Sequence, residues 1–306
     1  MAAGPHIPVL YQDIIHALQP KSGGLYVDCT LGGGGHAQGI LEASRPDGKL
    51  LGLDLDPQAI AIARKRLASF GERARIERAS YVELTSALKS AGWNLVDGIV
   101  FDLGVSSMQF GTPERGFSFQ HDGPLDMRFN PEGSVSAAEL VNQMSEAELA
   151  EIIFRYGEDR NARRIARAIV RARPLQTTSQ LAAVVAGAGG ARGHLHPATR
   201  TFQALRIAVN DELKSIEAAL PQAVQALNSG GRLAIISFQS LEDRIVKDYF
   251  NRESTDCLCP PQQPVCTCGH KATIRKVTRK PIVPTESEIS DNPRARSAKL
   301  RLAEKL

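Results

Sequence analysis

The segment at residues 25–36, LYVDCTLGGGGH, constrains the fold of this chain more than any other. An apolar run ends at Asp28, and four consecutive glycines follow at residues 32–35. A second apolar run, at residues 49–53, is followed by Asp54. A strand, a glycine turn, a helix and a second strand that ends in an acid form the cleft in which α/β proteins bind a ribose-bearing cofactor. The segment therefore predicts such a cleft.

The composition is that of a soluble globular protein, with 42% hydrophobic and 23% charged residues in a chain of 306. The net charge of +4 is too small to indicate a nucleic-acid partner by itself. No apolar run is long enough to span a bilayer, and the N-terminus lacks the pattern of a secretory signal. Four of the five cysteines lie in one short stretch, which fits a reducing cytoplasm better than a disulfide framework.

Strands and helices alternate in the first part of the chain. Asp56-Pro57 marks a helix start between two of the strands, with Asp56 as the N-cap. Short connections between such elements predict a parallel sheet with helices on both faces, an α/β fold. The strands are expected at residues 25–29, 49–53, 74–77 and 96–103.

The middle of the chain has a different pattern. No run from about residue 112 to residue 209 has the pattern of a strand, and the strand signal returns only at residues 231–238. We therefore expect an α/β domain formed by residues 1–112 and 210–306, interrupted by an all-helical insertion at residues 113–209.

Three side chains near the predicted cleft are candidates for ligand binding. Asp56 is better used as a helix cap, which leaves Asp54 for the ribose hydroxyls. His36 begins the helix after the glycine turn, where it either faces the ligand or has a capping or core role. Asp102 ends the fourth strand, at the sheet edge where a reacting group should lie, and its carboxylate could accept hydrogen bonds from an amine. A turn or cap aspartate is the alternative.

Two further segments indicate a substrate larger than a metabolite. The loop at residues 117–128 places aromatic side chains beside Asp122, Asp126 and Arg128. The aromatic rings could stack on a nucleic-acid base, and the alternative is an ordered surface loop with a salt bridge. A helix around residues 159–173 would present a row of arginines opposite an apolar face, which is the footprint of phosphate binding. The alternative is a solvated face partly paired with Glu148, Glu151 and Glu158. The row consists of Arg160, Arg164, Arg167 and Arg171.

The remaining polar clusters are ambiguous. The segment SFQSLEDR at residues 237–244 either contacts substrate or only starts a helix. Two Cys-x-Cys pairs, at residues 257–259 and 266–268, lie near His270. Four thiols could form a tetrahedral zinc site, but the spacing within each pair is tighter than usual and free thiols in a proline-rich loop are the alternative. No metal ligand is assigned from the sequence.

Nine blocks along the chain carry a resemblance: HIPVL, DCTLGGGGH, DLDP, DLGVSS, RGFSFQHDGPLDMR, YGEDRNARRIARAI, HPATRTFQALRIAVN, SFQSLEDRIVK and NPRARSAKLR. Together they resemble one family, the bacterial 16S rRNA (cytosine-N4)-methyltransferases, RsmH or MraW. The resemblance extends from residue 6 to about residue 304. It implies a class I S-adenosylmethionine-dependent methyltransferase core with a helical insert, and our hypothesis from the arginine row is that this insert binds RNA. It also implies S-adenosyl-L-methionine as the cofactor, and methyl transfer to N4 of one cytidine of 16S rRNA in the decoding centre of the small ribosomal subunit.

The resemblance also implies roles for individual residues. The candidate catalytic residue, Asp102, is a hypothesis that rests on its place at the end of the fourth strand. Gln239 stands where the family usually has histidine. Tyr81 stands where the family often has phenylalanine, and the tyrosine keeps an aromatic ring that could pack against adenine. The implied cofactor contacts are Gly34, Gly35, His36, Asp54, Tyr81, Asp102 and Gln109.

Three other functions remain open at this stage. The glycine turn and Asp54 alone would also suit a nicotinamide-dependent dehydrogenase, although that function leaves the arginine row unexplained. Gln239 is compatible with an RNA-binding assembly factor that has lost activity. An arginine row contacts phosphate on DNA as well as on RNA, so a DNA cytosine methyltransferase is the third alternative.

Overall fold

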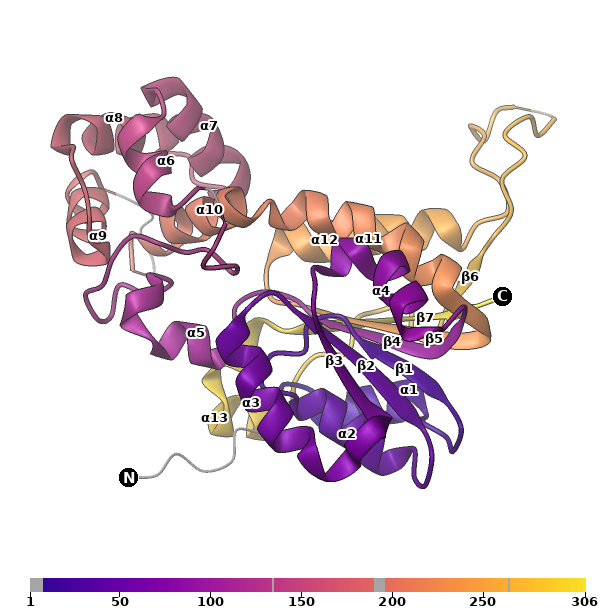
Figure 1. The fold of residues 1–306 in the computed structure, drawn as a ribbon. Helices are drawn as coiled ribbons and strands as arrows, with labels where there is room; N and C mark the ends of the chain where they lie inside the picture. The colour runs from indigo at the N-terminus through magenta and orange to yellow at the C-terminus, as the bar shows by residue number, and fades with distance from the viewer. Residues whose placement is uncertain (1–7, 134, 190–195, 264) are drawn as a thin grey trace. The chain divides into compact units, whose positions relative to one another are not determined.

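The computed structural model describes residues 8–133, 135–189, 196–263 and 265–306. They form two compact units (Figure 1). The sheet unit contains the described residues up to Gly104 and those from Leu213 onward, and the helical unit is Val105–Glu212. The helical unit thus begins at residue 105, where the sequence led us to expect 113, because Val105 packs against the helical core. It ends at Glu212, whose carboxylate accepts two hydrogen bonds from Arg206, at 2.7 and 2.9 Å.

A seven-stranded sheet forms the centre of the sheet unit, in the order β3-β2-β1-β4-β5-β7-β6. Neighbouring strands from β3 to β5 are parallel, and β7 lies antiparallel between β5 and β6. The sheet is therefore mostly parallel, as the alternating pattern predicts. Its strands are β1 (Leu25–Asp28), β2 (Lys49–Asp54), β3 (Ala74–Arg78), β4 (Val96–Asp102), β5 (Leu227–Ser237), β6 (Ile274–Lys276) and β7 (Lys299–Lys305).

The first four strands end within one residue of their predicted positions. β5 begins at Leu227, four residues before the expected 231, and its register against β4 shifts between Val96 and Gly98. The sequence analysis did not identify β6 or β7. Both are rich in lysine and arginine, and they are held by pairing with each other and with β5.

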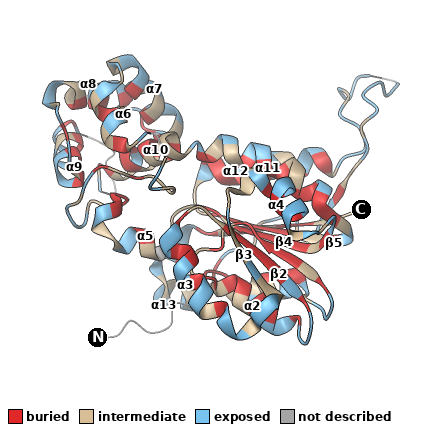
Figure 2. Ribbon diagram, viewed as in Figure 1, coloured by how far each residue is buried: buried red, intermediate tan, exposed pale blue. Residues whose placement is uncertain are grey.

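Each face of the sheet carries its own hydrophobic core. Alternation along β4 sends Ile99 and Phe101 to one face and Val100 to the other, where the two sets of side chains join separate clusters. Figure 2 shows the central strands buried and the covering helices exposed on their outer sides. The first cluster is covered by α4 (Leu84–Ala91), α11 (Glu212–Ala226) and α12 (Ser240–Glu253), and the second by α1 (Tyr11–Leu18), α2 (Gly35–Ala43) and α3 (Pro57–Leu67). The short α13 (Glu286–Asp291) precedes β7.

The helical unit has a core of its own. Buried Ile153, Ile165, Leu181 and Phe202 come from four different helices. In the described part of this unit the only β pairing is an isolated bridge between Pro124 and Thr177, as expected for an insertion without strands. Its helices are α5 (Ser107–Gly111), α6 (Ala137–Gln143), α7 (Glu146–Gly157), α8 (Ala162–Ala172), α9 (Thr178–Gly187) and α10 (Thr199–Asn210).

None of the helices within the described ranges is long and apolar enough to cross a membrane.

Candidate functional site

The carboxyl ends of β1, β2 and β4 are tied together by the turn that follows β1. The Cys29 amide donates to the Val100 carbonyl on β4, and the Leu31 amide donates to the Leu53 carbonyl on β2, both at 2.9 Å. The Thr30 hydroxyl accepts a hydrogen bond of 2.6 Å from the Asp102 amide. Because these bonds anchor the turn to both neighbouring strands, the glycines that follow are held at the edge where parallel sheets bind ligands.

Gly34 and Gly35 cannot be replaced without strain. Gly34 has a φ of +77° at the N-cap of α2, a conformation that side chains disfavour, and an added Cβ would lie 3.3 Å from Ala63. A Cβ on Gly35 would overlap the ring of Pro8. The glycines predicted to contact the cofactor are therefore also required by packing.

Asp54 supports the glycine turn with both carboxylate oxygens. Oδ2 accepts a hydrogen bond from the Gly32 amide and Oδ1 accepts one from the Asp56 amide, each at 2.8 Å. Burial raises the pKa of Asp54, against these two hydrogen bonds, which lower it. Asp56 is fully buried and caps α3 by accepting a hydrogen bond from the Gln58 amide at 2.9 Å. The prediction that Asp56 is the N-cap of this helix is therefore confirmed.

His36 and Asp102 leave buried polar atoms without partners. Both ring nitrogens of His36 and Oδ1 of Asp102 are buried and make no hydrogen bond with any described residue. His36 is 5% exposed, and its Nε2 lies 3.7 Å from Oδ2 of Asp102. Buried polar groups in folded proteins are almost always hydrogen-bonded. These two side chains are therefore available for contacts with a ligand at this edge.

Asp28 is a third acid at the same edge, which the sequence analysis did not assign to the site. It is 1% exposed, and its Oδ1 accepts from the Thr30 amide at 3.1 Å. Burial raises the pKa of Asp28 to about 7; His36 opposes this shift, and Asp102 and Asp54 add to it. The signal that could have found Asp28 is the one that found Asp54 and Asp102, an acid at the end of a buried strand.

Tyr81 and Gln109 lie in different units. Tyr81 begins a 3-10 turn (Tyr81–Glu83) after β3, and its ring packs edge-on against Phe101 with the centroids 5.6 Å apart. Gln109 belongs to α5 in the helical unit, where its side-chain oxygen accepts from the Ser106 amide at 3.0 Å. Gln109 thus forms one half of a capping box. Its predicted contact with the cofactor stays a prediction.

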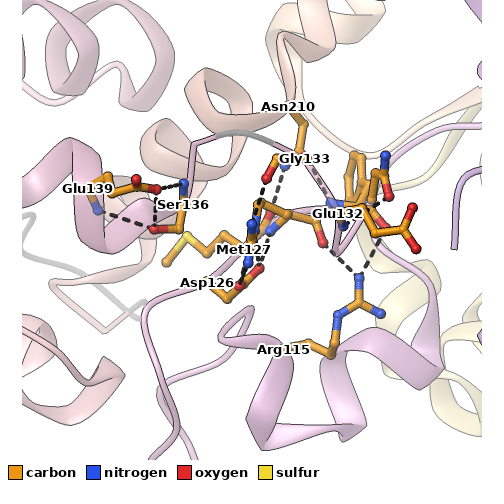
Figure 3. Close-up of polar contacts among 11 residues, drawn as sticks. Arg115, Asp126, Met127, Glu132, Gly133, Ser136, Glu139 and Asn210 are labelled. Atoms are coloured by element: carbon orange, nitrogen blue, oxygen red, sulfur yellow. Dashed lines mark hydrogen bonds and ion pairs between the residues drawn. The ribbon is translucent and has the colours of Figure 1, made fainter.

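The polar groups of the loop at residues 117–128 are engaged within the helical unit. Arg128 donates from Nε to both oxygens of Asp126 at 3.1 Å, and from Nη1 to the Gly133 carbonyl at 2.6 Å. Figure 3 shows Arg115 and Asn210 on two sides of this segment. The Arg115 guanidinium donates to the Arg128 carbonyl, and Asn210 donates to the Met127 carbonyl, both at 2.7 Å. These contacts fit the alternative of an ordered, salt-bridged loop.

The aromatic side chains of this loop pack inside the unit as well. Phe117 stacks on Phe129, and Phe119 packs edge-on against Phe202 with the centroids 4.9 Å apart. Asp122 accepts a hydrogen bond from the Ser179 amide at the start of α9, at 3.0 Å. The loop therefore uses its rings and acids to build the unit, and stacking on a base receives no support from it.

The segment SFQSLEDR starts α12 and fastens it to β7. The Gln239 side-chain amide donates to Glu242 at 2.9 Å, and the Phe238 amide donates to the same carboxylate at 2.9 Å. Asp243 accepts from Arg301 at 2.6 and 3.1 Å and from Lys299 at 3.3 Å. Of the two roles left open for this segment, helix initiation is the one these contacts support.

Three arginines of the predicted row, Arg164, Arg167 and Arg171, lie on α8, and Arg160 lies in the turn just before it. Ala162, Ile165, Ala166 and Ile169 are buried on one side of this helix. Arg167 forms an ion pair with Glu146 at 3.3 Å, and the other three arginines of the row are exposed and make no ion pair with the described residues. Of the three glutamates expected as partners, Glu148 binds Ser145 and Glu151 pairs with Arg155, so these two are engaged elsewhere.

Comparison with known proteins decides the family. The model of the MraW methylase family matches residues 3–306. The chain belongs to this family. As an MraW methylase it is an S-adenosylmethionine-dependent methyltransferase, and the class I fold expected from the sequence agrees with the observed strand order.

Curated relatives of this methylase match it over nearly its whole length. A ribosomal RNA small subunit methyltransferase H of Dehalococcoides mccartyi is 52% identical to this chain, and the alignment covers 100% of this chain and 88% of the relative. One from Geobacter sp. strain M21 is 54% identical over 98% of both chains. An rRNA methylase structure from Streptococcus thermophilus has a TM-score of 0.42 at 12% identity, covering 97% of this chain and 93% of its own, and adds nothing to the assignment.

Proposed function

We propose that this methylase transfers a methyl group from S-adenosylmethionine to N4 of one cytidine in the 16S rRNA of the small ribosomal subunit. The observation that carries the proposal is a set of buried polar atoms at the carboxyl edge of the sheet, both ring nitrogens of His36 and Oδ1 of Asp102, which have no hydrogen-bond partner among the described residues. The acceptor is inferred from the names of relatives about half identical to this chain. An rRNA acceptor implies a cytoplasmic enzyme.

The residues at the sheet edge fit the cofactor. Gly34 and Gly35 present backbone without side chains, and Asp54, held by two backbone amides, retains lone pairs that can accept from ribose hydroxyls. Tyr81 offers a ring beside β4 for the adenine. His36 and Gln109 complete the proposed contacts. When bound, S-adenosylmethionine supplies a methyl group made electrophilic by a positive sulfonium.

Asp102 is proposed to orient and activate the acceptor. N4 of cytosine is a poor nucleophile because its lone pair is delocalised into the ring, so in-line positioning is the main task, worth ~7–11 kcal/mol. The Asp102 carboxylate would accept hydrogen bonds from the N4 amino group and favour the positive charge that develops there. The backbone of Asp102 is fixed by Thr30, which limits the movement of this carboxylate.

The helical unit is proposed to bind the RNA through the exposed arginines of α8. Guanidinium groups on one face of a helix contact phosphates without reading sequence. The target base must leave its stack to reach the methyl donor, and the phosphate contacts would hold the strand on either side of it.

A transfer assay tests the proposal. Purified protein and labelled S-adenosylmethionine are incubated with unmethylated small subunits, with naked 16S rRNA and with duplex DNA, and the product nucleoside is identified by mass spectrometry. N4-methylcytidine from the subunits supports the proposal. Transfer only to DNA contradicts it. Binding of S-adenosylhomocysteine without transfer to any acceptor would favour the assembly factor.

A further inference from the structure

The loop between α12 and β6 is held at its base but has no core of its own. The Thr273 amide donates to the Glu253 carbonyl at 2.8 Å, and the Ala272 amide donates to Asp256 at 3.2 Å. None of the described residues between 254 and 273 is buried, and Leu258 and Val265 are 45% and 69% exposed. Since ordering a chain costs conformational entropy, a loop without apolar burial needs another source of stability.

Four thiols gather in this loop at distances that match a metal site. The sulfurs of Cys257, Cys259, Cys266 and Cys268 all lie within 4.8 Å of one another. Three of the separations are 3.4, 3.6 and 3.9 Å, far beyond the ~2.05 Å of a disulfide. Four sulfurs at ~2.3 Å around a tetrahedral zinc ion are about 3.8 Å apart. The two Cys-x-Cys pairs therefore meet at the spacing of a zinc site, although the spacing within each pair is shorter than usual.

Backbone amides surround the sulfurs as they do around thiolate ligands. The Leu258 amide donates to Cys268 at 3.3 Å, and the amides of Cys259 and Thr267 donate to Cys257 and Cys259, each at 3.4 Å. Hydrogen bonds of this kind from backbone amides stabilise charge on sulfur and orient the ligands. His270 contacts the Arg252 carbonyl with Nε2 at 3.0 Å, so the four sulfurs form the ligand set without it.

We propose that Cys257, Cys259, Cys266 and Cys268 bind one Zn²⁺ ion as a closed structural site. Four thiolates fill the tetrahedral coordination, so no position is open for catalysis. Each thiol that coordinates loses its proton, and the binding free energy becomes folding free energy of the loop. The site is independent of methyl transfer.

Metal analysis of the full chain tests the site. Protein purified in reducing buffer without chelators should contain close to one zinc ion per chain, as measured by inductively coupled plasma mass spectrometry. The double variant Cys257→Ser/Cys268→Ser should lose at least nine-tenths of that zinc. Gln262→Ala, which changes an exposed side chain in the same loop, should retain it.

A second measurement does not depend on the folding of the variants. Wild-type protein stripped of metal and reconstituted with cobalt(II) should show the strong visible bands of tetrahedral thiolate coordination, and zinc should displace them. Any of four results would overturn the proposal. These are four rapidly reacting thiols in protein supplied with zinc, disulfides between these cysteines in freshly reduced protein, iron in place of zinc, and zinc retained by the double variant.

Discussion

Nε2 of His36 lies 3.7 Å from Oδ2 of Asp102, and neither ring nitrogen of this buried histidine has a hydrogen-bond partner among the described residues. The two side chains come from the helix after the glycine turn and from the end of β4. Their separation is too long for a hydrogen bond, so each can turn to a ligand. This relationship distinguishes Asp102 from an ordinary turn or cap aspartate.

Replacing Asp102 should separate catalysis from cofactor binding. In Asp102→Asn the amide keeps the shape of the side chain but loses the charge that favours positive charge on N4. We expect the dissociation constant of S-adenosylhomocysteine to change less than fivefold and kcat to fall by about 10²–10⁴. Calorimetry and the methyl-transfer assay measure the two. Asp97→Asn, at the opposite end of β4, is the control and should retain both. Equal losses of binding and turnover in Asp102→Asn would limit this residue to the cofactor.

Asp28 should make stability depend on pH in a particular direction. Its pKa is about 7 in the fold against 3.8 in the unfolded chain, so between these values the folded state binds more protons. Its contribution is therefore present below pH 4 and is lost as the pH rises to 7, by about 4 kcal/mol in total. Asp28→Asn cannot ionise. Urea unfolding of both proteins from pH 5 to 8 should show wild type losing stability relative to the variant, and parallel curves would contradict the shift.

The chemistry of the sheet edge could be predicted in part from the sequence. Asp54 and Asp102 were found because each acid ends an apolar run, which is a local pattern. The burial of Asp28 and the absence of partners for His36 depend on how β1, β2 and β4 pack together, which no local pattern records. In the helical unit, Asp126 and Arg128 had the residue types of a site, but they bind each other and nearby backbone groups, which only the folded loop brings together.

Gly34 and Gly33 offer a matched pair within one turn. Gly34 has φ +77° and a close neighbour in Ala63, whereas a Cβ on Gly33 would make an ordinary contact of 3.6 Å with Ile62. Gly34→Ala should lower the free energy of unfolding by about 1–3 kcal/mol because alanine is strained there, and Gly33→Ala by about 0.5 kcal/mol or less. Chemical denaturation measures both. Similar losses in the two variants would show that the backbone conformation of Gly34 is not the cause.

The antiparallel strand β7 shows a different limit of prediction from sequence. β1, β2 and β4 were predicted because buried parallel strands are continuous apolar runs. β7 alternates charged residues with apolar ones and lies in a basic segment, so it resembles a tail until β5 is present to pair with it. For the same reason the Cys-x-Cys pairs stayed ambiguous, since their convergence depends on the base of the loop closing between α12 and β6.

The ion pair between Asp243 and Arg301 should stabilise the join of α12 to β7. Burial raises the pKa of Asp243, but the hydrogen bond and charge of Arg301, with Lys299, lower it below the usual value. Stability from this carboxylate is therefore present above pH 4 and is lost as the pH falls below it. Asp243→Asn should cost about 2 kcal/mol at pH 7 and less at pH 3.5. Asp248→Asn, exposed on the same helix, is the control. A loss that does not change with pH would exclude the charge as its origin.

The exposed arginines of α8 should account for part of the salt dependence of RNA binding. Each phosphate contact contributes about 0.7–0.9 to the slope of log affinity against log salt. Arg164→Glu and Arg171→Glu should therefore each weaken binding to small-subunit rRNA and flatten this slope by about that amount. Arg155→Glu makes the same change of charge on α7, where Arg155 already pairs with Glu151, and should leave the slope unchanged. Filter binding between 50 and 300 mM salt measures all three. If Arg155→Glu flattens the slope as much as the α8 variants do, the effect comes from the net charge of the helical unit, and α8 is not a specific phosphate-binding face.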